Sequence, residues 1–79
     1  MRATVLVRPK GGILDPQGEA VERSLRQLGF EVGEARVGRV IDLEVDASSA
    51  DEARSQLERM CENLLANPLI ESYEIEVAE

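Results

Sequence analysis

Histidine and tryptophan are absent from this chain of 79 residues, which also has only one cysteine, one phenylalanine and one tyrosine. Because Cys61 stands alone, no disulfide can form within the chain, and a single thiolate without histidine cannot complete a zinc site. The scarcity of aromatic rings also argues against an RNA-recognition module, which stacks bases on the rings of its sheet. No residue pattern indicates general acid–base or nucleophilic chemistry, so we expect no catalytic residue and no metal or cofactor on this chain.

Basic residues are also few. Nine Lys and Arg face 16 Asp and Glu, which gives a net charge of −7. Such a chain repels phosphate backbones, so a nucleic-acid partner is not expected. No apolar run approaches the roughly 20 residues of a membrane span, and no signal-peptide pattern is visible. We therefore expect no membrane association and a cytoplasmic location.

The apolar fraction of 43% is sufficient for one small core, so residues 1–79 are expected to form a single domain. A core of this size typically supplies only about 3–5 kcal/mol, and small folds often depend on disulfides, metals or association. With the first two excluded, we predict a homo-oligomer or a subunit of a larger assembly.

The hydrophobic periodicity predicts an α+β fold with the element order β-α-β-β-α-β. Strands are expected at 2–8, 31–37, 39–46 and 71–77, and helices at 16–28 and 50–67. The economical arrangement is the split βαβ (ferredoxin-like) sandwich, with a four-stranded antiparallel sheet and both helices on one face. Leu6 and Val40 would then lie on the open face.

The two middle strands are expected to form a hairpin around Gly38. A two-residue turn would place Ile41 and Leu43 on the same face as Glu34 and Arg36. A three-residue loop aligns them with apolar residues instead. Because burial of aliphatic side chains outweighs turn preference, we favour the longer loop or a bulge near Gly33.

The start of the first helix is unusual. Asp15 is a good N-cap and Pro16 suits the first helical position, but Gly18 costs about 1 kcal/mol relative to Ala in a helix. Gly18 either allows a partner to approach the backbone or packs against a neighbouring strand, and the sequence favours neither.

Two further features have ordinary explanations. The loop Arg8-Pro9-Lys10-Gly11-Gly12 resembles an anion cradle, but it lacks the Gly-Lys-Ser/Thr ending of a P-loop and is better explained as a flexible connection. Cys61 lies on the apolar stripe of the second helix, so a buried, inert thiol is expected.

Three segments together resemble PurS, the small subunit of phosphoribosylformylglycinamidine (FGAM) synthase. They are Leu14-Asp15-Pro16-Gln17-Gly18 with Ala20 and Val21, then Val37-Gly38-Arg39 with Leu43, and finally residues 60–67 with Pro68, Ile70, Glu71 and Tyr73. Arg39 stands where the family usually has Lys, and Asn63 where Lys is common.

The resemblance implies a non-catalytic adaptor of a glutamine- and ATP-dependent ligase in purine biosynthesis. Its partners would be a glutaminase subunit, which releases ammonia, and a large synthetase subunit, which uses ATP, magnesium and the released ammonia. The small subunit would form a homodimer or homotetramer, bridge the other two and support ammonia transfer.

On this hypothesis the helix start and nearby cations contact a partner: Asp15, Pro16, Gln17, Gly18, Arg8, Lys10 and Arg39. Asn67 and Tyr73 are weaker candidates, because a helix terminator and a core ring explain them adequately. The alternative is a dimeric metabolite-sensing regulatory domain of the same predicted fold.

Overall fold

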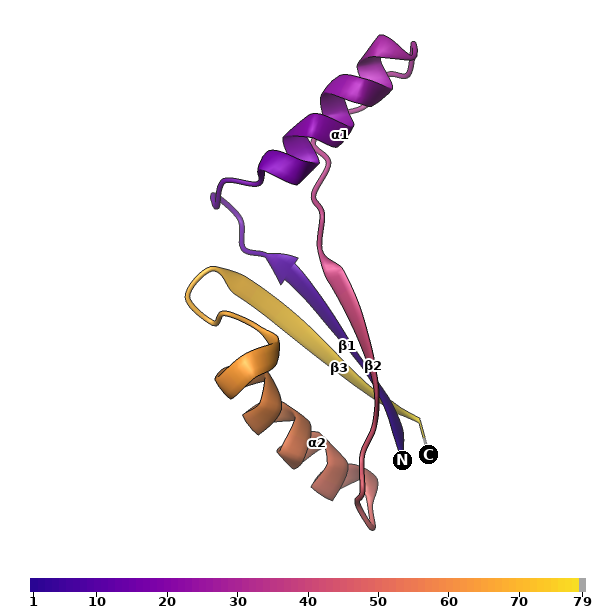
Figure 1. Cartoon of the computed structure of the whole chain (residues 1–79), viewed down its shortest axis with the longest axis vertical. Coiled ribbons are helices and arrows are strands. Elements are labelled where there is room, and N and C mark those ends of the chain that lie inside the picture. The colour runs from indigo at the N-terminus through magenta and orange to yellow at the C-terminus, as the bar shows by residue number, and fades with distance from the viewer. Residues whose placement is uncertain (79) are drawn as a thin grey trace.

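A computed structural model describes residues 1–78. The elements are β1 (Arg2–Pro9), α1 (Pro16–Gln27), β2 (Arg39–Glu44), α2 (Ala50–Met60), the π-helical turn η1 (Cys61–Leu65) and β3 (Glu71–Ala78). The strands form an antiparallel sheet in the order β2-β1-β3, and α2 lies against one face of it (Figure 1). None of the described helices is both long and apolar enough to cross a membrane.

The core lies between the central strand and α2. Alternation along β1 buries Ala3, Val5 and Val7 on the side of the sheet that α2 covers. Each of these side chains lies directly opposite a hydrophobic residue on one or both edge strands. Val5, for example, lies between Ile41 of β2 and Ile75 of β3. The predicted open face is also present, since Val40 is exposed on the side away from the core.

The second helix begins at the predicted residue, Ala50, and changes its winding before it ends. The Ser49 hydroxyl accepts the Glu52 backbone N–H, and Leu57 and Cys61 are fully buried. From Cys61 onward the helix is wound more loosely, in a π-helical turn. Leu65, the last residue of this turn, packs against the core, whereas Leu64 is 82% exposed.

The predicted four-stranded sheet is wrong for the single chain, which has three strands within residues 1–78. Residues 31–37 are extended but pair with no strand. They lie along α1 instead, where the Glu22 carboxylate accepts the Ala35 N–H at 2.7 Å and Arg26 donates to the carbonyl of Val32 at 3.3 Å. The side chains of α1 therefore bind polar groups that a sheet partner would otherwise satisfy.

The predicted hairpin at Gly38 is wrong for a related reason. The chain continues straight through Gly38 into β2, and β2 pairs with β1. A Cβ at Gly38 would overlap the carbonyl oxygen of Val7, so glycine is needed there for close passage over the end of β1 rather than for a turn.

As a result, the two helices do not share one face of the sheet. α1 and the extended segment that follows it project beyond the sheet as an arm, defined here as residues 16–38 (Figure 1). The molecule measures 50 × 25 × 14 Å, and it exposes several apolar side chains of the arm.

Candidate functional site

The three sequence segments that suggested a family meet where the arm joins the sheet. An open cleft of about 260 Å³, called here the junction cleft, is lined by Leu14, Asp15 and Gln17 of the first segment, Val37–Arg39 of the second, and Ile70 and Glu71 of the third. Pro9 and Ile13 complete its wall. The cleft therefore joins the end of β1, the start of α1, the start of β2 and the start of β3.

Arg39 and Glu71 form the ionic connection across this cleft. The guanidinium of Arg39 donates to the two carboxylate oxygens of Glu71 at 2.7 and 3.0 Å, and to the Leu65 carbonyl at 2.6 Å. The backbone N–H of Asn67 also donates to Glu71, at 2.7 Å. The hydrogen bond from Arg39 lowers the pKa of the Glu71 carboxyl most, and the bond from Asn67 lowers it further. Glu71 therefore stays ionised, and the positive charge of Arg39 neutralises it.

Asp15 forms hydrogen bonds to two parts of the arm at the other side of the cleft. Its carboxylate caps α1 by accepting the Gly18 N–H at 3.1 Å, and it accepts the Val37 N–H at 2.9 Å. The bonds from Val37 and Gly18 hold the pKa of this carboxyl below its ordinary value, and the positive charge of Arg36 acts in the same direction. Asp15 thus joins the first turn of α1 to the segment that runs into β2.

Gly18 is buried beneath this bond. A Cβ at this position would overlap the carbonyl oxygen of Ala35, so the chain's own extended segment occupies the space that glycine leaves free. Of the two explanations that the sequence left open, close packing within the chain is the one realised in this structure.

The loop between β1 and α1 is held by basic side chains. Arg36 donates to the carbonyls of Ile13 and Lys10 at 3.2 and 2.7 Å. The ammonium of Lys10 donates to the Pro68 carbonyl at 2.6 Å, and its backbone N–H bonds Ile70. The loop predicted as a flexible connection is therefore fixed at both ends.

The remaining candidates lie around the cleft or away from it. Pro16 and Gln17 are exposed in the first turn of α1, and Gln17 lines the cleft. Arg8 is outside it and pairs with Glu74 at 3.2 Å across the open face. Asn67 shapes the turn before β3, where its side chain accepts the Leu69 N–H at 3.1 Å.

Tyr73 lies on the α2 side of the sheet, where its hydroxyl donates to Glu62 at 3.0 Å. That bond, together with burial, raises the pKa of the phenol. A ring packed against the core with its hydroxyl bonded to a neighbouring carboxylate accounts for this residue.

Two residues at this site, Arg36 and Glu71, were not predicted from the sequence to be site residues. Arg36 was placed on a strand face, and Glu71 only at a strand start. A signal was present for Glu71, because an acid at a strand end is well placed to meet the basic Arg39 at the start of another strand. No local pattern signalled Arg36, since its bonds are to backbone carbonyls in a distant loop.

The cleft contains charged side chains that are already hydrogen-bonded, and apolar side chains that are exposed. Its acids accept backbone or guanidinium N–H groups, while Leu14 and Ile70 expose apolar surface at its rim. Within residues 1–78 no group of three or more His, Cys, Asp and Glu side chains is placed to hold a metal ion. This arrangement suits contact with another protein surface.

Comparison with protein families and curated sequences gives one consistent result. Residues 2–79 match the family described as PurS, phosphoribosylformylglycinamidine (FGAM) synthase. Among curated relatives, the phosphoribosylformylglycinamidine synthase subunit PurS of Methanocaldococcus jannaschii is 39% identical over 77 residues, which cover 96% of this chain and 93% of the relative. The subunit PurS of Bacillus subtilis is 39% identical over 79 residues, covering 99% and 93%.

Solved structures agree with the sequences. The crystal structure of PurS from Methanocaldococcus jannaschii superposes with a TM-score of 0.87 at 38% identity, covering 99% of this chain and 95% of that one. A chain in the structure of PurLQS from Thermotoga maritima gives a TM-score of 0.87 at 37% identity, covering 95% and 93%. The elongated shape with its projecting arm is thus shared with experimental structures.

Proposed function

Since this chain belongs to the PurS family, and is a subunit of FGAM synthase in purine biosynthesis, we propose that it is the non-catalytic adaptor of that ligase. The adaptor bridges the glutaminase subunit and the large synthetase subunit in the cytoplasm and supports ammonia transfer between them. ATP, magnesium and glutamine are used by those partners and not by this chain. The related PurS chain from Thermotoga maritima lies in a PurLQS complex, which supports this assignment.

The observation that carries the proposal is the state of the charges in the junction cleft. Asp15 is bonded to two backbone N–H groups, and Arg39 and Glu71 neutralise each other. A carboxylate held ionised by such bonds is a poor proton donor or acceptor near neutral pH. The same bonds make the cleft rigid, and rigidity favours a docking surface because little entropy is lost on binding.

We place the docking surface for a partner subunit at the rim of this cleft. Leu14 and Ile70 expose apolar area there beside the amide of Gln17, and Leu69 is exposed in the neighbouring turn. Four of the nine basic residues, Arg8, Lys10, Arg36 and Arg39, gather at this end of an otherwise acidic chain. Lys10 forms no ion pair within residues 1–78, and its ammonium uses one N–H on the Pro68 carbonyl, so its other N–H groups can donate to a carboxylate of the partner.

Pro16 and Gly18 contribute to this surface indirectly in the proposal. Pro16 starts α1 and Gly18 lets the arm pack closely, so both fix the angle at which Leu14 and Gln17 are presented. Asn67 orders the turn that carries Leu69. We further propose that the adaptor works as a homo-oligomer, because its arm leaves apolar side chains uncovered in the single chain.

Reconstitution with the two partner subunits tests the adaptor role. Omission of this chain should abolish glutamine-driven FGAM synthesis, while synthesis driven by added ammonium salt should be much less affected. Equal loss of both activities would show that the chain supports the synthetase reaction itself. Full glutamine-driven activity without the chain would refute the proposal.

The docking surface is tested with Leu14→Asp and Lys10→Glu. Each should weaken capture by the partner subunits at least tenfold and reduce glutamine-driven synthesis at limiting adaptor. Ser55→Asp is the matched control for Leu14→Asp, because it adds the same single negative charge at an exposed position of α2 far from the cleft. Unchanged capture of Leu14→Asp would place the contact elsewhere.

A further inference from the structure

The outer side of β3, called here the β3 edge, is one of the two edges of the sheet. The strands are ordered β2-β1-β3, so within residues 1–78 β3 pairs with β1 on one side only (Figure 1). An edge strand presents N–H and C=O groups to which another extended chain can add. The β3 edge is therefore an interaction surface unless something covers it.

The alternation of hydrogen bonds identifies the backbone groups on this edge. Met1 and Val45 exchange both of their hydrogen bonds at 2.7 Å, so the odd-numbered residues of β1 bond to β2. The even-numbered residues of β1 then bond to the even-numbered residues of β3. The N–H and C=O groups that point outward on the β3 edge therefore belong to Tyr73, Ile75 and Val77.

A side chain of α2 occupies the middle of this edge. The guanidinium of Arg54 donates to the Ile75 carbonyl at 3.1 Å. Ile75 lies near the centre of β3, which runs from Glu71 to Ala78. A second strand that bonded to this carbonyl would have to displace the guanidinium, and the positive charge of the donor strengthens the existing bond.

The apolar face of β3 would favour pairing with a second copy. If two β3 strands paired antiparallel around Ile75, that residue would lie opposite its own copy, and Tyr73 would lie opposite Val77. All three side chains pack against the core on the α2 side of the sheet. Cross-strand pairs of aromatic and β-branched side chains stabilise a sheet. Without an obstacle, the β3 edge would thus be complementary to itself.

The opposite face of β3 resists such pairing only in part. Glu74 and Glu76 are exposed there, and in the same register each would lie opposite the other copy's second glutamate. Like charges directly opposite each other destabilise a strand pair. Arg8 already lies 3.2 Å from Glu74, however, and relieves part of this repulsion. The bond from Arg54 is therefore the main obstacle on this edge.

We propose that Arg54 blocks the β3 edge and prevents copies of this chain from joining through it. The excluded partner is β3 of another copy. This inference rests on the proposed function, in which the chain works as a homo-oligomer. Each copy in that oligomer carries one β3 edge, so pairing between oligomers would not close and would extend into a filament. Arg54 keeps the adaptor at a defined size.

The proposal is tested with Arg54→Ala. Arg54 is exposed and alanine is the best helix former, so the variant should fold. Light scattering after gel filtration, from micromolar to millimolar concentration, should give a constant mass for the natural protein. The mass of Arg54→Ala should rise at least twofold over this range. Arg54→Lys should keep the natural mass, because its ammonium can donate to the same carbonyl.

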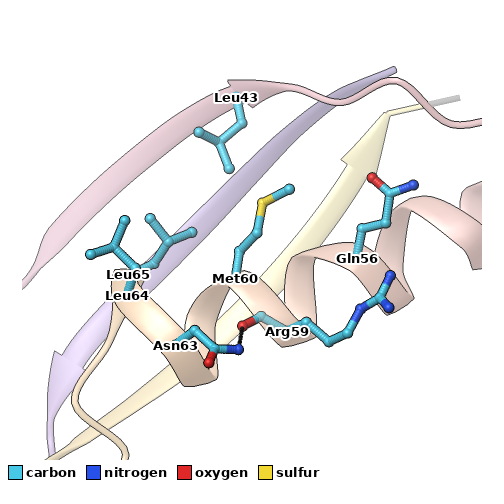
Figure 2. A pocket seen from close by; sticks show the side chains of 7 residues that line it. All are labelled: Leu43, Gln56, Arg59, Met60, Asn63, Leu64 and Leu65. Atoms are coloured by element: carbon cyan, nitrogen blue, oxygen red, sulfur yellow. Dashed lines mark hydrogen bonds between the residues drawn. The ribbon is translucent and has the colours of Figure 1, made fainter.

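The matched control is Arg59→Ala. Arg59 is also an exposed arginine of α2, but it lines a groove of about 580 Å³ on the side of the helix that faces Leu43 of β2 (Figure 2). Both alanine variants make a chain of net charge −7 one unit more negative, which increases the general repulsion between copies. Arg59→Ala should therefore keep the natural mass. Equal growth of both variants would refute a specific role of Arg54.

Hydrogen exchange identifies the surface that associates. The Ile75 N–H faces outward, so it should exchange rapidly in the natural protein and at least tenfold more slowly in the Arg54→Ala assemblies. Mass spectrometry of fragments from Glu71–Ala78 measures this ratio. An unchanged mass of Arg54→Ala, or growth without slower exchange at Ile75, contradicts the proposal.

The outcome is separable from that of the proposed function. A natural protein that stays a single chain would refute the homo-oligomer, but the comparison of Arg54→Ala with it still shows whether Arg54 blocks the edge. The adaptor role is judged by the reconstitution with the partner subunits, which uses the natural chain.

Discussion

The guanidinium of Arg39 and the carboxylate of Glu71 bind each other through two hydrogen bonds, and each makes one further bond to the backbone between η1 and β3. The pair therefore links the start of β2, the end of η1 and the start of β3. Arg39→Ala should lower the free energy of unfolding by roughly 1 kcal/mol. This value lies between the contribution of an exposed ion pair and that of a hydrogen bond to a charged group. Arg39→Lys should lose about half as much. Urea unfolding at fixed protein concentration measures both.

Arg2 supplies the matched control. It lies 3.6 Å from Glu44, and the two side chains are 80% and 77% exposed. Arg2→Ala should change stability by less than about 0.5 kcal/mol, because exposed pairs contribute little. If both alanine variants lose equally, the geometry at Arg39 has no special importance.

Gly18 and Gly11 should respond differently to substitution by alanine. Alanine normally stabilises a helix interior by about 1 kcal/mol relative to glycine. At Gly18, however, the new methyl group would overlap the Ala35 carbonyl, so Gly18→Ala should destabilise the chain by about 1–3 kcal/mol. Nothing lies within 4 Å of a Cβ at Gly11, and Gly11→Ala should be nearly neutral. A stabilised Gly18→Ala would mean that the arm segment does not pack against α1 in solution.

Much of this fold follows from local patterns. The alternation of apolar residues located β1 and β3 to within one residue, and both helices begin at the predicted residues, Pro16 and Ala50. The family resemblance, drawn from three short segments, is confirmed by the match over residues 2–79. These features depend on neighbours in the sequence, which is why the sequence alone predicts them.

The fourth strand was predicted from the same kind of pattern and was wrong for the single chain. Residues 31–37 alternate as a strand does, but alternation does not specify which edge, or which molecule, supplies the hydrogen-bond partner. The carboxylates of Glu22 on α1 and of its N-cap Asp15 accept the N–H groups of Ala35 and Val37 instead. Gly38 was misinterpreted for a similar reason, since close passage over Val7 and a tight turn both require glycine.

The site was predicted in part. Asp15, Gln17 and Arg39 do line one cleft, yet the bonds that occupy Asp15 and Arg39 come from Val37 and Glu71, which are 22 and 32 residues away along the chain. Partners so distant in the sequence are set by the tertiary fold, and residue type alone does not identify them.

Cys61 should be unreactive while the chain is folded. Its side chain is fully buried, and burial, then the nearby charges of Glu62 and Glu58, raise the pKa of the thiol. Since the thiolate is the reactive form, iodoacetamide at pH 8 should label the native protein at least tenfold more slowly than the protein in urea. Mass spectrometry of timed samples measures the ratio. Comparable rates would show that η1 opens readily.

Acid should destabilise the chain through Asp15 and Glu71. Both carboxyls have a lower pKa in the folded protein than the ordinary values of 3.8 for Asp and 4.5 for Glu. The folded state therefore binds fewer protons, and the stability that these groups contribute is fully present above those values. It is lost as the pH falls through the lower folded-state pKa values. The free energy of unfolding should thus be level from pH 6 to pH 7 and should decrease as the pH falls below about 4.5.

Asp15→Asn and Glu71→Gln should each have a lower free energy of unfolding at pH 6 and a less steep decrease in acid, because each variant lacks one of the two linked protons. Denaturant titrations at one protein concentration measure these slopes without a contribution from a changing degree of association. A variant whose decline runs parallel to that of the natural protein identifies a carboxylate whose bonds at the junction do not stabilise the folded chain.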